Sequence, residues 1–596
     1  MSGISLVLSA AKDALITSQY AIDVVSHNVT NVNTPGYSRQ SPIISAKDPA
    51  TYAGLVMGRG VEMEEIVRNT DSFIETRLRE RNADLASMSE KEVYFSALEG
   101  IFNESSDLSL SAQFADFWNA WNDLSNNPSG NAERNALYEM GSLLTQSFRN
   151  LSGDLDQFKR EINLALEAGV EKVNQITTEI ASLNQEIVAQ EAAGNANDLR
   201  DKRNALLSEL SEYLDIKSFE YDNGTITVMT SGGYSLVDKA ASYTLSMDAG
   251  NIMWEGSGGM LVNMSDRISG GKLCGWLDMR NEVIPKYEAD LSELAKATIF
   301  EVNKIHSQGV GLEVFQAGQS LMGTYTVDPD GDPTATPPIP ASSLATLSYG
   351  NKIDFDNGSF TLWIGDAEGA NLVAVPIDLS TSGLNGDSTL EDLADYLSAQ
   401  IGGGVNVTVS DNALFLAADD SHSFAFSDDT SNILSALGLN TFFDGQDALT
   451  MRMNTLLEIN REYMAAGKID STTGSFAVGD NTNALAMAEL QYESVTVERW
   501  TYERGEDPTS QSVNDTLENY LHSFVGSIGT ESQSVTRSKE YNQAILDQLN
   551  AVRDSVSAVS LDEEMTELIK YQQGYAAAAK LISVADEMFE AVLETK

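Results

Sequence analysis

The hydrophobic and polar positions at the two ends of the chain follow the same helical repeat. Near the start, apolar residues recur at steps of three, four or seven, among them Ile4, Leu8, Leu15, Ile22, Val25 and Val29. Near the end, Leu561, Leu568, Tyr575, Ile582 and Phe589 are each seven residues apart, with Tyr571, Ala578, Ala585 and Val592 between them. This spacing keeps one apolar stripe turned toward a partner helix. The sequence therefore predicts that the two terminal helices pair with each other and with copies of themselves.

The first third of the chain is otherwise mostly helical in pattern. A helix is expected to begin at Ser72, whose spacing to Glu75 is that of a capping box. Later apolar faces predict four further helices, over residues 110–124, 132–151, 154–193 and 197–214. Between the first helix and Ser72, residues 37–46 and 55–67 have extended character. So much helix with short breaks favours a helical bundle.

The middle of the chain changes character. Residues 218–247 alternate as strands do, and residues 272–306 return to a helix that Pro285 either kinks or begins anew. From Gly309 to about Asp447 the chain is rich in Gly, Asp, Ser and Thr, with clear strands over 360–364, 405–409 and 413–417. From about Leu449 helices are expected to return, to be interrupted over 467–483, and then to continue to the end.

These patterns predict a multidomain α+β fold. A discontinuous, elongated helical bundle or coiled coil comes from both chain ends, and β-rich domains are inserted in the middle. The expected parts are an axial helix with an extended hairpin region (1–68), a helical bundle (69–215), a β-rich segment (216–271) and a helix returning to the bundle (272–308). They are followed by a β-rich insertion (309–448), the second part of the bundle (449–540) and the closing axial helix (541–596).

Composition excludes several classes of partner. The chain has 37 Lys and Arg against 88 Asp and Glu, a formal net charge of −51. Nucleic acid is therefore not expected as a partner, because phosphate binding needs a basic face. No run reaches the ~18 apolar residues of a membrane span, so we expect no membrane insertion. The N-terminus lacks the basic residues and cleavage site of a secretory signal peptide, so export would use another route.

The chemistry-bearing residues predict no catalytic residues, no cofactor and no metal. The single cysteine, Cys274, stands in apolar company typical of a core thiol. The four histidines are far apart in sequence, and His27 suits the end of the first helix better than catalysis. Residues 328–332 resemble the opening of a calcium loop, but Pro333 stands where that loop needs Gly. The acids Glu563 and Glu564 are explained by a capping box from Ser560 and by the helix dipole.

The segment after the first helix carries a recognisable motif. It comprises Asn28, Asn31, Asn33, Thr34, Pro35, Gly36 and Tyr37. Pro35 and Gly36 suit the centre of a type II turn, where Pro fixes φ and Gly supplies a positive φ. The motif resembles the N-terminal signature of the bacterial flagellar rod and hook axial proteins. Residues 37–40 and the segments at 117–134, 197–203 and 479–485 are similar to the hook-associated junction branch of that family. The segment at 560–578 resembles the closing helix of the axial family as a whole.

The resemblance covers both helical ends and leaves out the β-rich insertion. It implies export through the flagellar type III apparatus with the help of a chaperone that binds the C-terminal helix. It also implies an extracellular homo-oligomeric zone at the distal end of the hook. There the protein would join the hook protein to a neighbouring hook-associated junction protein on the filament side. The residues named above for the apolar stripes of the first and last helices would be the packing residues of this assembly.

Two alternatives stay open at this level. The chain could be a hook or rod structural protein, or the insertion at 309–447 could make it an adhesin that binds calcium or a glycan. An enzyme has no nucleophile and base pattern to support it. Because isolated helices of this length are marginal, we also expect the two termini to be loose in the free subunit and to order on assembly.

Overall fold

A computed structural model describes residues 2–52, 55–103, 109–192, 194–256, 258–328, 340 and 342–594. The chain divides into two compact units, each assembled from distant segments. The first unit comprises residues 1–94, 161–280 and 532–596, and the second comprises residues 95–160 and 281–531. Long helices and small antiparallel sheets make up both units, so the mixed helical and sheet class that the sequence predicted is confirmed. No helix within the described ranges is long and apolar enough to cross a membrane.

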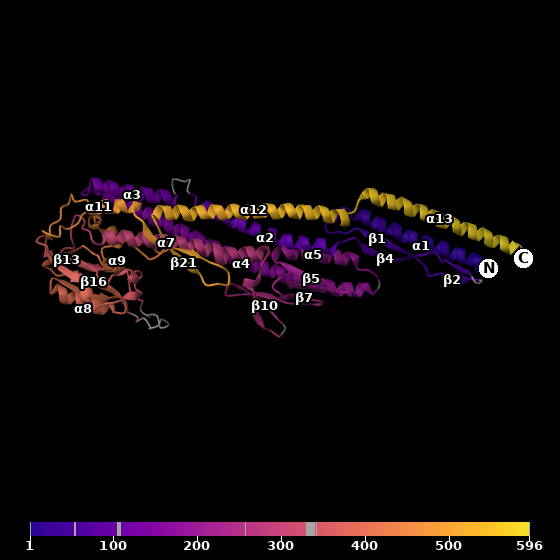
Figure 1. Ribbon diagram of the computed structural model, residues 1–596, viewed down its shortest axis with the longest axis horizontal. Coiled ribbons are helices and arrows are strands. Elements are labelled where there is room, and N and C mark those ends of the chain that lie inside the picture. The colour runs from indigo at the N-terminus through magenta and orange to yellow at the C-terminus, as the bar shows by residue number, and fades with distance from the viewer. Residues whose placement is uncertain are drawn as a thin grey trace. The chain divides into compact units, whose positions relative to one another are not determined.

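The first unit contains the two terminal helices, and both chain ends lie at the same end of that helix pair (Figure 1). Its helices are α1 (Ser2–Thr30), α2 (Ser72–Ile101), α4 (Asn131–Glu191), α5 (Asn197–Tyr213), α6 (Gly271–Asp278), α12 (Leu517–Ser557) and α13 (Leu561–Glu594). Of these, α2, α4 and α12 also contribute residues to the second unit. Each helix has a buried apolar face, as the periodicity predicted.

Two local expectations for these helices are wrong. The helices expected over 132–151 and 154–193 are one continuous helix, α4. Gly153 lies there with open space around its Cα, and a lone glycine costs a helix only about 1 kcal/mol, too little to end it. At the start of α2, the N–H groups of Phe73 and Ile74 donate to the carboxylate of Asp71, at 2.9 and 3.3 Å. The cap is therefore Asp71, not Ser72.

The first unit also contains four small antiparallel sheets. Strand β1 (Gln40–Ala46) pairs with β4 (Val61–Arg68), and β2 (Ala50–Tyr52) pairs with β3 (Leu55–Met57). A four-stranded sheet comprises β5 (Ile216–Glu220), β6 (Ile226–Thr230), β7 (Ser235–Asp238) and β8 (Ala241–Ser242). A three-stranded sheet comprises β9 (Leu245–Asp248), β10 (Asn251–Glu255) and β11 (Leu261–Asn263). The strands expected over 218–247 are thus present.

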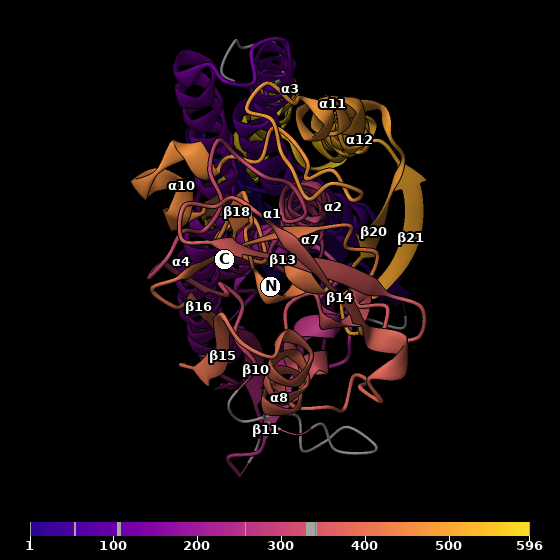
Figure 2. The ribbon, with the colours of Figure 1, turned by 90° about the vertical axis from the view of Figure 1, so that its left-hand side faces the viewer.

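The helical part of the second unit includes α3 (Leu110–Asn126), α7 (Ile284–His306) and α11 (Thr482–Glu489). Pro285 lies in the first turn of α7, directly after a π-helical turn over Met279–Val283, so it begins a new helix. The continuous helix expected after residue 483 is wrong. Strands β20 (Val495–Thr501) and β21 (Thr509–Asp515) form a hairpin there, with β21 on the outer side of β20 (Figure 2). Val495 and Val497 are buried while Thr496 is exposed, the period of two that a strand requires.

The β-rich insertion belongs to the second unit. Its two main sheets have the orders β14-β13-β17 and β12-β16-β15, and a short pair joins β18 to β19. The strands are β12 (Ser320–Met322), β13 (Ser359–Asp366), β14 (Val373–Asp378), β15 (Val405–Ser410), β16 (Ala413–Ala418), β17 (His422–Ser427), β18 (Phe443–Asp444) and β19 (Arg452–Met453). Its helices are α8 (Leu390–Ile401), α9 (Ile433–Leu437) and α10 (Thr455–Ile459). The calcium-like acidic turn and a Pro-rich loop were expected over residues 328–340. Within this range the structure describes only Asp328 and Pro340.

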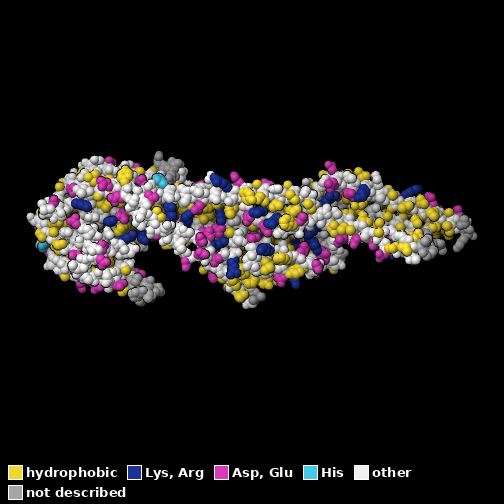
Figure 3. Space-filling view, in the orientation of Figure 1, with side chains coloured by type: hydrophobic (Ala, Val, Ile, Leu, Met, Phe, Trp, Pro, Cys, Tyr) yellow, Lys and Arg dark blue, Asp and Glu magenta, His cyan; other side chains and the backbone are white. Residues whose placement is uncertain are grey.

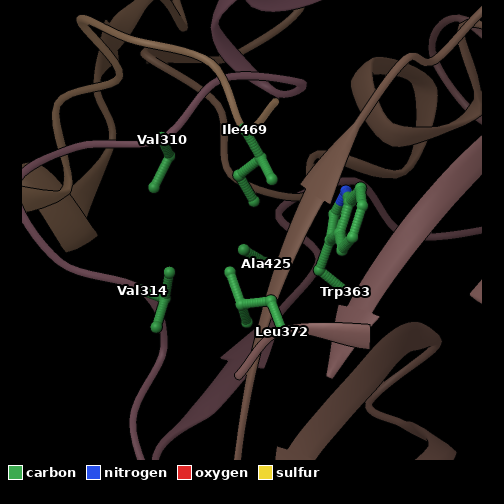
Figure 4. Close-up of a cluster of buried hydrophobic side chains, with 6 residues drawn as sticks. All are labelled: Val310, Val314, Trp363, Leu372, Ala425 and Ile469. Atoms are coloured by element: carbon green, nitrogen blue, oxygen red, sulfur yellow. The ribbon is translucent and has the colours of Figure 1, made fainter. Parts of the chain in front are cut away.

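A compact apolar cluster packs residues of the insertion against Ile469, in the segment that follows it (Figure 4). It comprises Val310, Val314, Trp363, Leu372, Ala425 and Ile469. Trp363 packs its ring in this cluster, and its indole N–H donates to the hydroxyl of Ser427 at 2.8 Å. The core of the insertion is therefore completed by Ile469, from the segment that follows it.

Candidate assembly site

Helices α1 and α13 pack side by side along their lengths (Figure 1). On α1 the buried apolar residues of this pair are Ala11, Ala21, Val24 and Val25. On the described part of α13, Glu564, Ala578 and Ala585 are the buried residues. The contact between the helices is therefore formed largely by small side chains, and α13 turns little of its apolar surface toward α1.

Small residues allow the backbones in this region to approach closely. A Cβ on Gly574 would lie 3.3 Å from the hydroxyl oxygen of Ser18 on α1. A Cβ on Gly60 would lie 3.1 Å from the Cα of Ala10, and Gly60 has a positive φ of 98°. The loop before β4 and the helix α13 thus both rest against α1, and larger residues at Gly60 or Gly574 would force them away.

The predicted packing residues are divided between this contact and the surface. On α1, Val25 is buried, Ile4, Leu15, Ile22 and Val29 are half-buried, and Leu8 is exposed. On α13, Leu568 and Ile582 are half-buried, whereas Leu561, Tyr575 and Phe589 are exposed. The alternate heptad set, with Ala578 and Ala585, lies deepest in the pair. The role of these residues in assembly stays a prediction.

A second apolar stripe runs along the outer side of α13, which we call the outer stripe. It comprises Ala577, Leu581, Val584 and Met588, at steps of four, three and four. Leu581, Val584 and Met588 keep 50%, 38% and 50% of their surface exposed. Hydrophobic side chains accordingly show across the surface of the terminal helix pair (Figure 3). The residues of this stripe were not among the predicted packing residues, although they are seven residues apart in two pairs in the sequence.

Three polar residues interact where α1 ends and α13 begins: Asn28, Arg39 and Glu564. We call them the polar lock. The amide of Asn28 donates to Glu564 Oε2 at 2.9 Å, and Arg39 Nε donates to Glu564 Oε1 at 2.7 Å. Asn28 and Glu564 are each only 1% exposed. Charge-assisted hydrogen bonds of this kind are about twice as strong as neutral ones, and removing one partner leaves a buried group unsatisfied.

The neighbouring acid Glu563 also contacts Arg39, but at the surface. Arg39 Nη1 donates to Glu563 Oε2 at 2.6 Å, and the Glu563 side chain is 64% exposed. The carboxylates of Glu563 and Glu564 are thus both directed at Arg39. The expected capping box between Ser560 and Glu563 is not what positions Glu563, because its described hydrogen bond runs to the guanidinium.

The motif turn positions Asn28 of the polar lock through hydrogen bonds. The N–H of Tyr37 donates to the carbonyl of Thr34 at 3.2 Å, and Gly36 has a φ of 78°, as the expected Pro-Gly turn requires. The hydroxyl of Tyr37 then donates to Asn28 Oδ1 at 2.7 Å, and the N–H of Gln40 donates to the same oxygen at 2.9 Å. Burial and the nearby acids Asp198, Asp201 and Glu564 raise the pKa of Tyr37 well above its usual value, so it stays a hydroxyl.

The other motif residues have less central positions. The amide of Asn31 donates to the carbonyl of His27 at 3.0 Å, and the hydroxyl of Thr34 donates to Asn31 Oδ1 at 3.1 Å. Asn33, Thr34, Pro35 and Gly36 are exposed. His27 lies in the last turn of α1, as expected, with Nδ1 3.1 Å from the hydroxyl oxygen of Tyr37. The motif therefore has a structural inner part and a surface-exposed tip.

The start of α5 holds the extended strand that follows the turn. Asp201 accepts from the N–H and the hydroxyl of Ser38, each at 2.9 Å, and from Arg68 Nη1 at 2.7 Å. The amide of Gln40 donates to Asp198 at 2.9 Å. Two segments that were singled out separately in the sequence, 28–40 and 197–203, thus meet in one polar network, which sequence spacing gave no means to foresee.

Reactive chemistry is not apparent in the residues described. No group of three or more His, Cys, Asp or Glu residues there is placed to hold a metal ion. Cys274 is buried, with its Sγ 3.6 Å from Asp278 Oδ2. What the terminal helix pair offers instead is an apolar helical surface beside a rigid polar joint, and such a surface binds other helices.

Comparisons with known proteins agree in pointing to one group. Residues 95–322 match the family model described as the flagellar hook-associated protein FlgK helical domain. Residues 554–595 match the flagellar basal body rod FlgEFG protein C-terminal model, and residues 8–37 match that of the flagella basal body rod protein. The two terminal matches fall on α13 and on α1 with the motif turn.

Relatives named flagellar hook-associated protein 1 align with almost the whole chain. The protein of Escherichia coli K12 is 24% identical over 99% of this chain and 100% of its own length. The protein of Bacillus subtilis 168 is 25% identical over 98% of this chain and 97% of its own length. A solved structure of the flagellar hook junction protein FlgK from Burkholderia pseudomallei matches with a TM-score of 0.47 at 16% identity, covering 81% of this chain and 100% of that one.

Proposed function

Because this chain is a homologue of flagellar hook-associated protein 1 over 99% of its residues, we propose that it is a structural component of the bacterial flagellum that joins the hook to the filament. It would act outside the cell as a short zone of copies at the distal end of the hook. Its partners there would be the hook protein on one side and a hook-associated junction protein on the other. No catalytic step is part of this proposal, because the family is structural.

The observation that carries the proposal is the outer stripe of α13. Leu581, Val584 and Met588 form a helical row of large apolar side chains that the chain itself leaves 38–50% exposed. Soluble monomers rarely keep such a row exposed at heptad spacing, and the partner that fits it is another helix. In a homo-oligomer the terminal helices of neighbouring copies supply that partner. Contacts of one face with a different face of the next copy then generate rings or open helices.

Electron microscopy of isolated hooks incubated with the purified, tagged protein tests the proposal. We expect label at the distal hook end only. The double variant Leu581→Glu/Met588→Glu should lose this label, because it places two charges on the outer stripe. The matched control is Ile459→Glu, which adds a charge at an apolar residue of α10 that is 84% exposed and lies in the other unit; it should bind as the wild type does.

Other outcomes would contradict the proposal in distinct ways. Label along the whole hook would favour a surface-binding module, such as the adhesin that the β-rich insertion left open. Distal binding by the double variant would show that the outer stripe is not the assembly face. Loss of binding in the Ile459→Glu control would show that the effect is not specific to α13.

The same helix is the proposed site of the export chaperone. An apolar stripe exposed before assembly promotes premature association, and a chaperone that covers it would prevent this. Titration of the chaperone of the same organism into the full chain should give binding to the wild type and to Ile459→Glu, and at least tenfold weaker binding, about 1.4 kcal/mol, to the double variant. Equal affinity for all three proteins would place the chaperone elsewhere.

A further inference from the structure

Helix α13 carries two apolar faces, and α1 occupies the less hydrophobic one. The face against α1 buries Ala578 and Ala585, whereas the outer stripe offers Leu581, Val584 and Met588. Burial of apolar area alone would favour α1 on the outer stripe, because larger side chains remove more surface from water. Some other interaction must therefore choose the face.

The face against α1 is also poorly suited to fix the register of the helices. Its buried apolar residues, Ala578 and Ala585, are two identical small side chains seven residues apart. A shift of seven residues would place one alanine where the other had been, and register in a coiled coil is set by distinct side chains. The close approach of Gly574 to Ser18 favours the observed register, but it involves small residues that fit several positions.

The polar lock has the properties that both choices require. It lies at the first turn of α13, and its carboxylate accepts from Asn28 and from Arg39 while almost fully buried. Asn28 is itself fixed, because its Oδ1 accepts from the N–H of Gln40 and from the hydroxyl of Tyr37. Rotating or sliding α13 would leave the buried carboxylate of Glu564 without these partners. It would also remove one hydrogen bond from Arg39 and one from Asn28, whose amide would keep its bond to the carbonyl of Gln40. Buried polar residues in coiled coils set register and partner choice in this way.

We propose that Glu564, held by Asn28 and Arg39, determines which face and which register of α13 pack on α1, and so keeps the outer stripe free for a neighbouring copy. The second clause rests on the proposed function, whereas the choice of face and register does not. Glu563 is excluded from this role by its exposure, although it contacts the same arginine. Glu564 is a positioning residue, since it acts through the orientation of the helix.

Disulfide trapping in the free, monomeric full chain tests the proposal. Ser18→Cys with Gly574→Cys reports the observed packing, because these positions are in contact. Ser18→Cys with Ala577→Cys reports a helix turned toward its outer stripe. Each pair is made with Glu564→Gln and Glu564→Ala, and with Glu563→Gln as the matched control, which neutralises the neighbouring acid on the same arginine. Cys274 is buried and is retained.

We expect the wild type and Glu563→Gln to form the Ser18–Gly574 crosslink almost exclusively. Glu564→Ala should lower the ratio of the first crosslink to the second about tenfold, and Glu564→Gln should lower it less, since an amide keeps one hydrogen bond. Near-identical ratios in all variants would overturn the proposal. An equal drop in Glu563→Gln would also overturn it, because net charge would then explain the effect. Failure of the wild type to bind hooks, together with the expected fall in the ratio for the Glu564 variants, would count against the proposed function alone.

Discussion

The terminal helix pair of the first unit and the aromatic core of the second unit solve the problem of burial in opposite ways. In the aromatic core, Phe117 and Trp121 of α3 pack on Phe442, with ring centroids 5.7 and 5.3 Å apart, and all three are fully buried. In the terminal pair, the described part of α13 buries only three side chains and leaves its largest apolar residues in solvent. The core is buried within one chain, whereas under the proposed function neighbouring copies would cover the exposed residues of the pair.

Polar groups show the same contrast. In the core, His306 is fully buried and accepts from the N–H of Ala465 through Nε2 at 3.0 Å, while Nδ1 lies 2.8 Å from the carbonyl of Asn440. The amide of Asn440 in turn donates to the carbonyls of Ser307 and Gly309. These hydrogen bonds connect several segments of the core, whereas the buried ion pair of the helix pair lies at one end, in the polar lock. We infer that the second unit specifies one folded state, and that the terminal pair keeps a face for other copies.

The largest effect is expected from a cavity in the aromatic core. Trp121→Ala should lower the free energy of unfolding of the second unit by about 3–5 kcal/mol, because it removes a fully buried ring. Chemical denaturation of the full chain measures this loss. Tyr492→Ala is the matched control, since Tyr492 is 76% exposed and should change stability by less than about 0.5 kcal/mol. Equal losses in the two variants would remove the contrast between core and surface.

Two buried groups of the core should respond to pH in opposite directions. Burial lowers the pKa of His306 to about 4, so its contribution to stability is present above its ordinary value of 6.5 and is lost as pH falls toward 4. Burial raises the pKa of Asp444 to about 6, so its contribution is present below its ordinary value of 3.8 and is lost as pH rises through 6. Each shift corresponds to about 3 kcal/mol, so the two largely cancel between pH 4 and 6.5.

Asp444→Asn should uncover this cancellation. Without the titration of Asp444, the free energy of unfolding should fall by about 3 kcal/mol more between pH 6.5 and 4 than it does in the wild type. Denaturation at a series of pH values measures the slope. The exposed acid Asp420, changed to Asn, serves as a control and should leave the slope unaltered. A parallel pH dependence in Asp444→Asn and wild type would contradict the assignment.

A smaller effect is expected at the polar lock. Asn28→Ala removes the acceptor for Tyr37 and Gln40 and the donor to Glu564, and should lower the local stability of the helix pair by about 1–3 kcal/mol. Asn33→Ala changes an exposed asparagine of the same motif and should have no measurable effect. Amide exchange in residues 10–28 reports the difference. Similar exchange in both variants would show that the motif acts only through its turn.

The smallest effect on the free subunit is expected at the outer stripe. Leu581→Glu should change the stability of the monomer by less than about 0.5 kcal/mol, because its side chain is already half exposed. Thermal unfolding of the dilute protein measures this. A loss comparable to that of Trp121→Ala would mean that the outer stripe is already covered within the subunit.

The sequence predicted most of the helices, because their apolar periodicity extends over many turns. It failed where local signals were weak or were opposed by their surroundings. Two helices were expected over 132–151 and 154–193, but the residues between them keep helical spacing and α4 is continuous. The hairpin β20–β21 was interpreted as helix, although Val495 and Val497 alternate with polar residues as strands do. The chain-end pairing followed from the heptads, but the choice of face did not.

The candidate site was predicted only in part. The heptad that includes Tyr571, Ala578 and Ala585 places Glu564 one step earlier, and an acid at a seam position was a signal of a buried partner. That partner could not be identified, because Asn28 and Arg39 are more than 500 residues away and nothing local links them to Glu564. The network that joins residues 28–40 to the start of α5 is likewise a product of tertiary contacts.

Hydrogen exchange of the free subunit and of the subunit bound to hooks tests the central claim most directly. In the free protein, amides of α1 and α13 should exchange much faster than those of α3 and α7, because the helix pair lacks part of its apolar cover. On assembly, α1 and α13 should become protected while α3 stays as it was. The opposite result, with α1 and α13 as protected as α3 in the free protein and unchanged on hooks, would show that the pair is already complete within one chain.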